Sequence, residues 1–350
     1  MFFYVFNSEN RDYNIIFQYI PSFISNWDRD KYEIHLFENL YLNAENDVFE
    51  VYEHTIKDER LGWIFPITIL ESNENDYTDC KNLNHYKFIA YQKLLEQDAI
   101  VSVNDKSIDY GKLSDIFPNT IVCILCKETS QKIRDFRIDN YLLSFYDYGY
   151  LHFEGYPKAQ AIYDRAGWVT EMRQHKRVIL HKANFDITIN GYTNALFKEH
   201  LLQSDNHIIR FIFLYQIIEH FIQVDFDSQF KTHLNSFNNR QLTLNDFKEE
   251  ISTLSSERKR INNVFASVQL LADLKSDFVS EFDFLINDIG RTYKKNTFED
   301  KIYDFRNLIT HDLRQLTPKV DSLKKIIGIF ERITVSLLIH LPTYLTLNKE

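Results

Sequence analysis

Glycine and proline are scarce in this sequence, which has 8 and 6 of them in 350 residues. So few glycines leave little material for the glycine-rich loops that cradle nucleotide phosphates. The three cysteines, Cys80, Cys123 and Cys126, are too few for a disulfide framework or a cysteine cluster for metal, and no HExxH segment occurs. The residues therefore predict neither a metal nor a cofactor, and they favour a reduced cytoplasmic setting.

Long uncharged hydrophobic runs are also missing. The first residues, MFFYVFNSENRD, lack a basic leader and soon become polar, which is unlike a signal peptide. The most apolar late stretch, residues 326–347, contains Glu331, Arg332, His340 and Pro342 and suits a buried helix better than a bilayer span. We expect a cytoplasmic protein with no membrane partner.

Basic residues are in deficit, with 40 Lys and Arg against 50 Asp and Glu. A net charge of -10 argues against a surface covered in non-specific nucleic-acid contacts, because each phosphate contact needs local positive charge. An acidic protein can still bind RNA where its basic side chains gather in one cleft. The aromatic share of 15% indicates aromatic-rich cores.

The chain changes character near its middle. Residues 1–185 predict a mixed, strand-rich domain of unknown fold, because short aromatic and β-branched runs alternate with turns. Strands are expected at residues 31–36, 48–52, 62–66 and 120–126, a helix at 83–97 and a hairpin at 141–155.

Residues 186–350 predict an all-α bundle, so that the whole chain is of the α+β class. Apolar residues recur at steps of three and four from Ile208 to Phe221, a stripe wide enough to face a core. Further helices are expected at residues 242–261, with Thr243 or Asn245 as the cap, and at 264–274, 278–289, 298–313 and 320–339.

The helix expected at 298–313 carries the candidate catalytic residues. Asn307 lies four residues before His311 and Asp304 seven before it, so the three share one polar face. Arg306 is five residues before His311, about 140° around the axis and about 7.5 Å along it. Its long side chain can reach round toward the histidine. The opposite stripe, expected to be buried, comprises Ile302, Phe305, Ile309, Leu313 and Leu316.

These side chains suit metal-free cleavage of RNA, in which the ribose 2′-hydroxyl attacks the neighbouring phosphorus. Histidine titrates near neutral pH and can act as general base or acid. Arginine keeps its charge and can hold two phosphate oxygens. The amide of Asn307 can orient either group. By spacing alone, an exposed arginine and histidine on an ordinary amphipathic helix remains the alternative.

The segment Arg306-Asn-Leu-Ile-Thr-His311 resembles the motif of HEPN superfamily ribonucleases, an arginine, a polar residue and a later histidine on a late helix. The segment from Arg210 through Tyr215 to Glu219 is similar to the early helix of the Apea-like branch. The resemblance covers roughly residues 190–345 and implies a metal-independent endoribonuclease with Arg306 and His311 as the catalytic pair, to which Asn307 and Glu219 are added as candidate site residues. A glutamate at a helix edge that pairs with a lysine remains the alternative for Glu219.

The family also implies a homodimer whose two Arg–His helices face one cleft, and a role as a toxin or abortive-infection effector in antiviral defence. The tyrosine that some members carry two residues after the histidine is Leu313 here, so control through its modification is not expected. A phage or cellular trigger at residues 1–185 would fit this architecture. The alternatives are a non-catalytic HEPN bundle for dimerisation or for binding nucleic acid or nucleotide, and a regulatory subunit that docks on another protein.

Overall fold

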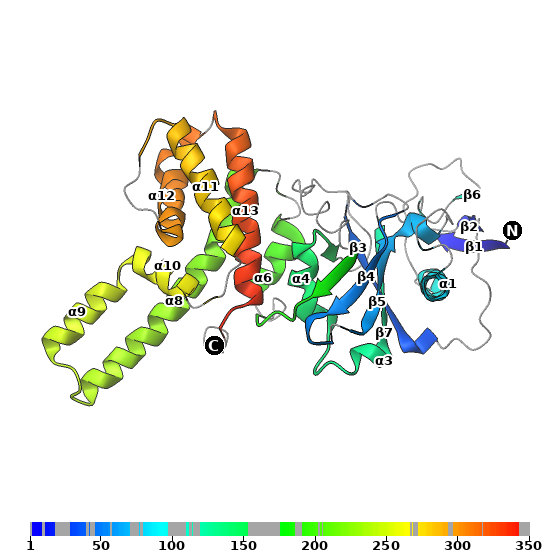
Figure 1. The fold of residues 1–350 in the computed structure, drawn as a ribbon, viewed down its shortest axis with the longest axis horizontal. Coiled ribbons are helices and arrows are strands. Elements are labelled where there is room, and N and C mark those ends of the chain that lie inside the picture. Colours follow the sequence, from blue (N-terminus) through cyan, green and yellow to red (C-terminus); the bar gives the residue numbers. More distant parts are fainter. Residues whose placement is uncertain are drawn as a thin grey trace. The chain divides into compact units, whose positions relative to one another are not determined.

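In the computed structural model the chain divides into two compact units, residues 1–181 and 182–350. The first is strand-rich and the second helical (Figure 1), which confirms the expected α+β class. The sequence predicted the boundary after residue 185. The structure describes residues 2–8, 11–17, 29–39, 42, 46–56, 58–70, 77, 80–96, 110–111, 114, 120–152, 176–185, 191–201, 204, 206–266, 268, 272–292, 297–316 and 318–342.

A six-stranded mixed sheet forms the centre of the amino-terminal unit. In spatial order its strands are β8 (Leu151–His152), β3 (Tyr32–Glu38), β7 (Thr120–Cys126), β5 (Arg60–Pro66), β4 (Phe49–Glu53) and β9 (Arg177–Leu180). All neighbours are antiparallel except β4 and β9, which are parallel. The strands expected at residues 31–36, 48–52, 62–66 and 120–126 are present as β3, β4, β5 and β7.

Different helices pack on the two faces of this sheet (Figure 1). Helix α1 (Lys81–Glu96), expected at residues 83–97, packs Leu83, Ile89 and Leu94 into a core with Trp63 of β5 and Val122 of β7. Alternate residues of a strand point to opposite faces. The other face therefore receives Cys123.

Short helices cover that second face. Phe37 of β3 packs against Phe145 of α4 (Leu142–Asp147), with ring centroids 4.5 Å apart, and against Tyr150, at 6.0 Å. The hairpin expected at residues 141–155 is therefore wrong for its first part, because 142–147 are helical; residues 153–155 lie outside the described residues. Between β7 and α4 lie the short α3 (Lys127–Ser130) and a 3₁₀ turn, Ile138–Tyr141.

A smaller sheet and several 3₁₀ turns complete the described part of this unit. Strands β1 (Phe2–Ser8) and β2 (Arg11–Phe17) form an antiparallel pair, and β6 (Tyr110–Gly111) lies parallel to β2. The remaining 3₁₀ turns are Arg29–Lys31, His54–Ile56 and Ile67–Leu70.

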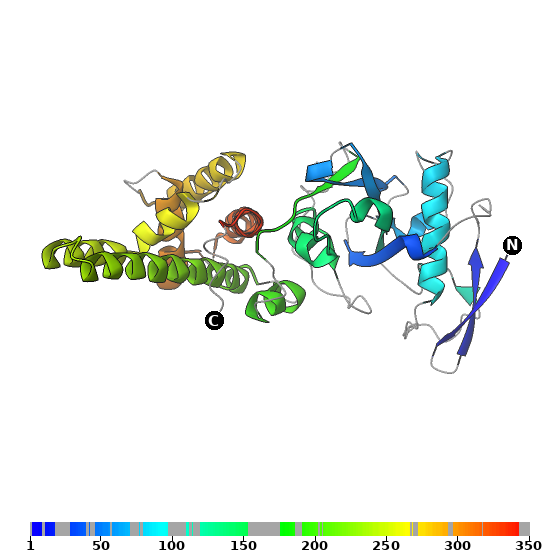
Figure 2. The ribbon, with the colours of Figure 1, turned by 90° about the horizontal axis from the view of Figure 1, so that it is seen from below.

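The carboxy-terminal unit is built from helices whose apolar stripes meet. Its elements are α6 (Gly191–Ala195), a π-helical turn (Leu196–His200), α8 (His207–Asn238), α9 (Leu244–Leu254), α10 (Glu257–Ala266), α11 (Ala272–Asp288), α12 (Phe298–Leu316) and α13 (Val320–Ile339). Phenylalanines dominate the core. The ring centroid of Phe211 on α8 lies 4.9 Å from the centroids of both Phe305 on α12 and Phe330 on α13. The later part of α8 and helix α9 form an antiparallel pair that projects from this bundle (Figure 1), and Figure 2 shows the length of α8 from below.

Capping residues explain where two of these helices begin. Asn206 accepts hydrogen bonds from the backbone N–H groups of Ile208 and Ile209 and so starts α8. Thr243, one of the two expected caps, forms a capping box with Asp246 at the start of α9. The single helix expected at 242–261 is wrong, because the chain breaks at Ser255–Ser256 and restarts as α10. The helix expected at 264–274 is also wrong: α10 ends at Ala266 and α11 begins at Ala272.

Candidate functional site

Helix α12 presents the predicted site residues on its outer side. Its apolar residues Ile302, Phe305 and Ile309 face the core and are buried. Arg306 and Asn307 are left half-buried and His311 exposed at the helix surface. The expected buried stripe is confirmed at these apolar positions and at Leu316, but Leu313 is 40% exposed.

The guanidinium of Arg306 lies among groups from three helices. Its Nη1 donates a hydrogen bond of 3.0 Å to Oδ1 of Asn307. Its Nη2 is 3.9 Å from Oε1 of Glu219 on α8, and its Nε is 3.7 Å from Oε1 of Glu257 on α10. The guanidinium also lies 5.9 Å from the ring centroid of Tyr215 on α8. With 25% of its side chain exposed, Arg306 is accessible while its surroundings hold it in place.

The contact with Asn307 orients the arginine. Asn307 shares a helical face with His311, four residues further on. A hydrogen bond from Arg306 to Asn307 therefore turns the guanidinium toward the face that carries the histidine. The structure thus brings together three of the four predicted residues: Arg306, Asn307 and Glu219.

Arg306, Asn307, Glu219, Tyr215 and Glu257 form one cluster, in which Tyr215 and Glu257 lie on the side nearer the core. The hydroxyl of Tyr215 donates a 3.0 Å hydrogen bond to Oε1 of Glu257, the same oxygen that faces Nε of Arg306. Burial of Tyr215 and the nearby Glu257 carboxylate both raise the pKa of the phenol above its ordinary value. Tyr215 therefore remains a hydrogen-bond donor and holds Glu257 beside the arginine.

Glu219 forms the outer edge of the cluster. Its side chain is 48% exposed. Partial burial and the neighbouring Glu257 carboxylate raise its pKa, while Arg306 opposes the shift. The cluster contains two carboxylates, those of Glu219 and Glu257, and one guanidinium, that of Arg306. An anion that approaches Arg306 is therefore repelled by Glu219 and Glu257 when both are ionised.

His311 lies where α12 loses its regular geometry. The next residue, Asp312, has non-helical backbone angles (φ -127°, ψ 23°). Its carboxylate accepts a 2.9 Å hydrogen bond from Nη1 of Arg291, which holds the pKa of Asp312 below its ordinary value. This change of direction explains why Leu313 does not continue the buried stripe. It also leaves His311 exposed at the bend, and within the described part of the chain no hydrogen bond or ion pair joins it to Arg306.

Asp304 does not share an open polar face with His311, so the prediction made from their spacing is wrong for this residue. It is buried, and its Oδ1 accepts a 2.7 Å hydrogen bond from Nη2 of Arg258 on α10. Arg258 also pairs with Asp300, and its guanidinium lies 4.5 Å from the centroid of the Tyr303 ring. These contacts tie α10 to α12. They explain why Glu257, the neighbour of Arg258, reaches Arg306.

Glu257 is the site residue that the sequence analysis missed. A serine before a helical segment is a common start signal, and Ser256-Glu257 has this form. A break here would have placed Glu257 in the first turn of a new helix. Its partner Arg306 lies 49 positions further on, and only the packing of α10 against α12 brings the two together.

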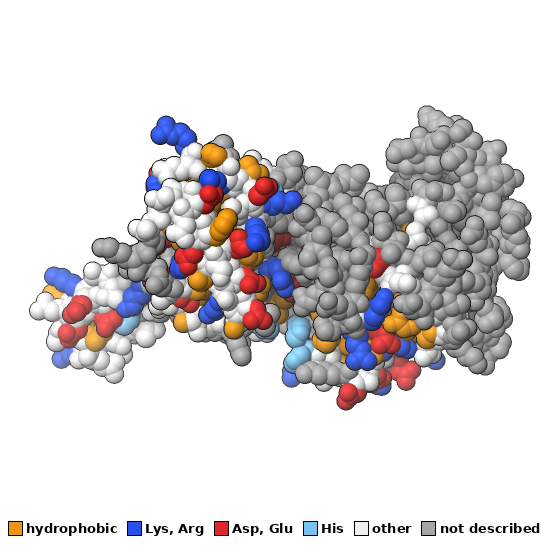
Figure 3. Space-filling view, turned by 45° about the horizontal axis from the view of Figure 1, so that its top comes forward, with side chains coloured by type: hydrophobic (Ala, Val, Ile, Leu, Met, Phe, Trp, Pro, Cys, Tyr) orange, Lys and Arg blue, Asp and Glu red, His pale blue; other side chains and the backbone are white. Residues whose placement is uncertain are grey.

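The other charged side chains of the helical unit are interspersed over the face that Figure 3 presents. Among the described residues, no group of three or more histidine, cysteine or acidic side chains could hold a metal ion. Cys123 in β7 is fully buried, which raises the pKa of its thiol, and Cys126 is partly buried.

The described helices include none that is both long and apolar enough to cross a bilayer. Comparisons of the chain with models of protein families, with characterised proteins and with solved structures found no match.

Proposed function

We propose that residues 186–350 form a HEPN-type endoribonuclease domain that cleaves RNA without a metal. The resemblance of the segment from Arg306 to His311 to the HEPN motif motivates this proposal. The single observation that supports it best is the hydrogen bond from Arg306 to Asn307, which turns the guanidinium toward the helical face of His311. An accessible fixed cation and an exposed imidazole are then available on one helix.

The chemistry assigned to these groups is the attack of a ribose 2′-hydroxyl on the adjacent phosphorus. One group removes the 2′ proton, and another donates a proton to the departing 5′ oxygen, which leaves a 2′,3′-cyclic phosphate. His311 serves one of these transfers. Arg306 stabilises the negative charge that develops on the phosphoryl oxygens. Glu219, whose pKa is raised, is the candidate for the second transfer.

A homodimer would supply a second Arg306 and His311 to the same cleft. The two residues of one chain lie about 140° apart on an ideal helix, so a symmetric partner can provide the complementary pair. RNA is the proposed substrate. The proposed setting is the cytoplasm, with the protein acting as a toxin or an effector of antiviral defence. In this proposal residues 1–185 receive a phage or cellular trigger.

The test is cleavage of structured and unstructured RNA by the purified full chain in the presence of EDTA. We expect His311→Ala and Arg306→Ala each to abolish cleavage while the helical circular dichroism is retained. Arg314→Ala is the matched control, because Arg314 is an exposed arginine on the same helix. His233→Ala, on α8, controls for the histidine. Cleavage that persists in both site variants would remove this proposal.

The second candidate is a non-catalytic bundle for dimerisation or for binding nucleic acid or nucleotide, and the charge around Arg306 favours the dimerisation role. Glu219 and Glu257 lie 3.9 Å and 3.7 Å from the guanidinium nitrogens and repel an incoming phosphate. This candidate predicts that wild-type protein cleaves none of the RNAs. It also predicts that dimerisation, measured by light scattering, is the same in wild type and His311→Ala.

A further inference from the structure

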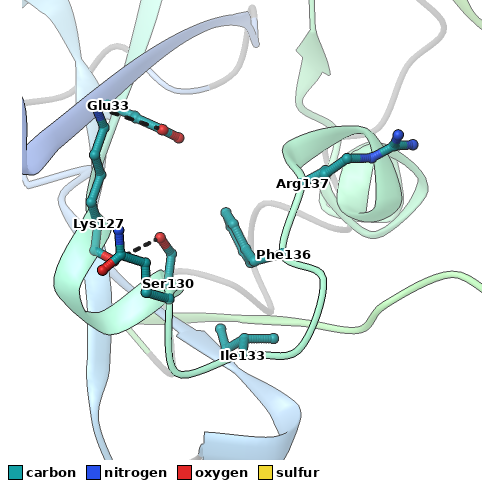
Figure 4. Close-up of a pocket in the computed structure, with 7 residues that line it drawn as sticks. Glu33, Lys127, Ser130, Ile133, Phe136 and Arg137 are labelled. Atoms are coloured by element: carbon teal, nitrogen blue, oxygen red, sulfur yellow. Dashed lines mark hydrogen bonds and ion pairs between the residues drawn. The ribbon is translucent and has the colours of Figure 1, made fainter.

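The amino-terminal unit contains an open pocket at the end of β7 (Figure 4). Its volume is about 430 Å³, within the range of about 300–1,000 Å³ typical of small-molecule sites. Seven side chains line it: Glu33, Lys127, Ser130, Gln131, Ile133, Phe136 and Arg137. Six of the seven come from one segment of eleven residues, 127–137, and Glu33 comes from β3.

That segment is fixed by its own hydrogen bonds. The backbone N–H of Gln131 donates to the carbonyl of Lys127 at 2.9 Å, and that of Ile133 donates to Ser130 at 3.0 Å. The N–H of Phe136 donates to Ile133 at 3.3 Å. The ring of Phe136 is stacked on Tyr141, with centroids 5.1 Å apart and an interplanar angle of 30°. The pocket is therefore formed before any ligand binds.

An aromatic surface and charged groups share this pocket. Ile133 and Phe136 supply the apolar part, and the Phe136 ring stands between the wall formed by Lys127 and Ser130 and the residue Arg137 (Figure 4). Nζ of Lys127 lies 4.0 Å from Oε1 of Glu33. This separation exceeds a hydrogen bond, so the ammonium group retains donor capacity for an anion. The Arg137 side chain extends away from the ring in this view.

We propose that this pocket binds a nucleoside monophosphate. The base stacks on Phe136, because every nucleobase has a flat face that packs on an aromatic ring. The phosphate contacts Lys127, which acts as a point charge for phosphate oxygens. Glu33 accepts hydrogen bonds from ribose hydroxyls, as carboxylates do in dinucleotide sites. Inorganic phosphate would leave the Phe136 surface unused, and an uncharged aromatic compound would leave Lys127 unused.

The test is calorimetric titration of the full chain with AMP, GMP, CMP and UMP, and with the matching nucleosides. We expect saturable binding of at least one nucleotide. Phe136→Ala should weaken binding of both nucleotide and nucleoside at least about fivefold, the loss expected for one base stack. Lys127→Gln should weaken binding of the nucleotide and leave that of the nucleoside unchanged.

Lys132→Gln is the matched control. Lys132 lies in the same segment but pairs with Glu59 and does not line the pocket, so nucleotide binding should be unchanged. All three tryptophans lie in residues 1–181, so tryptophan fluorescence checks the folding of this unit. If Phe136→Ala does not fold, Phe136→Leu replaces it, and its nucleotide affinity should also fall.

Three results would overturn the proposal. One is the absence of saturable binding by wild type with all four nucleotides. Another is equal nucleotide affinity in wild type and Lys127→Gln. The last is nucleotide binding that survives unchanged in a folded Phe136 variant.

Discussion

Arg210 and Glu331 form a two-point ion pair inside the helical unit. Nε of Arg210 donates to Oε2 of Glu331 at 2.8 Å, and Nη2 donates to Oε1 at 3.0 Å. Their side chains are 1% and 0% exposed. Arg210 also donates to the carbonyl of Ser204 at 3.2 Å and to that of Leu201. The arginine that opens the segment resembling the early HEPN helix therefore joins α8 to α13.

Replacing Arg210 by Met should destabilise the helical unit strongly. Removal of one partner leaves the Glu331 carboxylate charged and buried, which costs about 3–5 kcal/mol. Urea unfolding followed by circular dichroism at 222 nm measures this loss. Lys325→Met is the control, because Lys325 pairs with Glu281 at the surface between α13 and α11. It should cost less than about 1 kcal/mol. Equal losses in the two variants would contradict a special role for the buried pair.

Gly62→Ala should disrupt the central sheet of the amino-terminal unit. A Cβ atom added at this position would lie 3.0 Å from the carbonyl carbon of Ile124 in β7, and even closer to its oxygen. Both contacts are with backbone, so β5 and β7 would have to separate. Tryptophan fluorescence should report a loss of folding that circular dichroism of the helical unit does not follow.

Gly191→Ala is the control for Gly62→Ala, because it adds the same methyl group at a glycine with open space around it. Nothing lies within 4 Å of a Cβ atom added at Gly191, which begins α6. Alanine is the better helix former by about 1 kcal/mol in a helix interior, so this variant should be neutral or slightly stabilised. A folded, fully stable Gly62→Ala protein would show that the approach of β5 to β7 is not required.

Local patterns were sufficient to predict several elements. The expected helix at residues 320–339 matches α13, and the strand at 120–126 matches β7. The helix has a long apolar stripe at helical spacing, and the strand is a short continuous apolar run with polar residues at its borders. The hairpin at 141–155 was wrong in its first part, because Leu142–Asp147 forms a short, largely buried helix whose aromatic composition resembles that of a strand. Apolar runs of this length do not distinguish the two structures.

The candidate site was predictable only in part, for a related reason. Arg306, Asn307 and His311 share one helix, so their mutual positions follow from helical geometry up to the bend at Asp312. Glu257 comes from another helix, and its contact with Arg306 depends on how α10 packs. No local period encodes that packing, so the sequence did not predict a second carboxylate beside Arg306.

Glu38→Gln should stabilise the amino-terminal unit at alkaline pH. Glu38 is buried at the end of β3, and burial raises its pKa to about 7. The unfolded chain ionises this carboxyl at about pH 4.3. The stability that the neutral carboxyl contributes is present below that pH and is lost as pH rises through about 7. The difference in unfolding free energy between the variant and the wild type should therefore grow over this interval by roughly 3.5 kcal/mol.

Urea midpoints followed by tryptophan fluorescence at pH 5 and pH 8 measure this effect, and the variant should gain most at the higher value. Glu128→Gln, an exposed change in α3, should give a difference that does not vary with pH. A Glu38→Gln advantage that is equal at both pH values would show that Glu38 is ionised in the folded protein even at the lower pH.

Neutralising the carboxylates beside Arg306 should strengthen RNA binding, if the proposed site holds RNA. The measurement uses the His311→Ala background, in which cleavage does not interfere. A unit charge about 5 Å from a phosphate contributes roughly 0.8 kcal/mol in water, so Glu219→Gln should tighten binding about fourfold at low salt, and Glu257→Gln similarly. Glu249→Gln, an exposed change on α9, is the control and should have little effect. Because the pKa of Glu219 is raised, its variant should differ less from the parent as pH falls. Weaker RNA binding in both site variants would mean that these carboxylates position Arg306 for the substrate instead of repelling it.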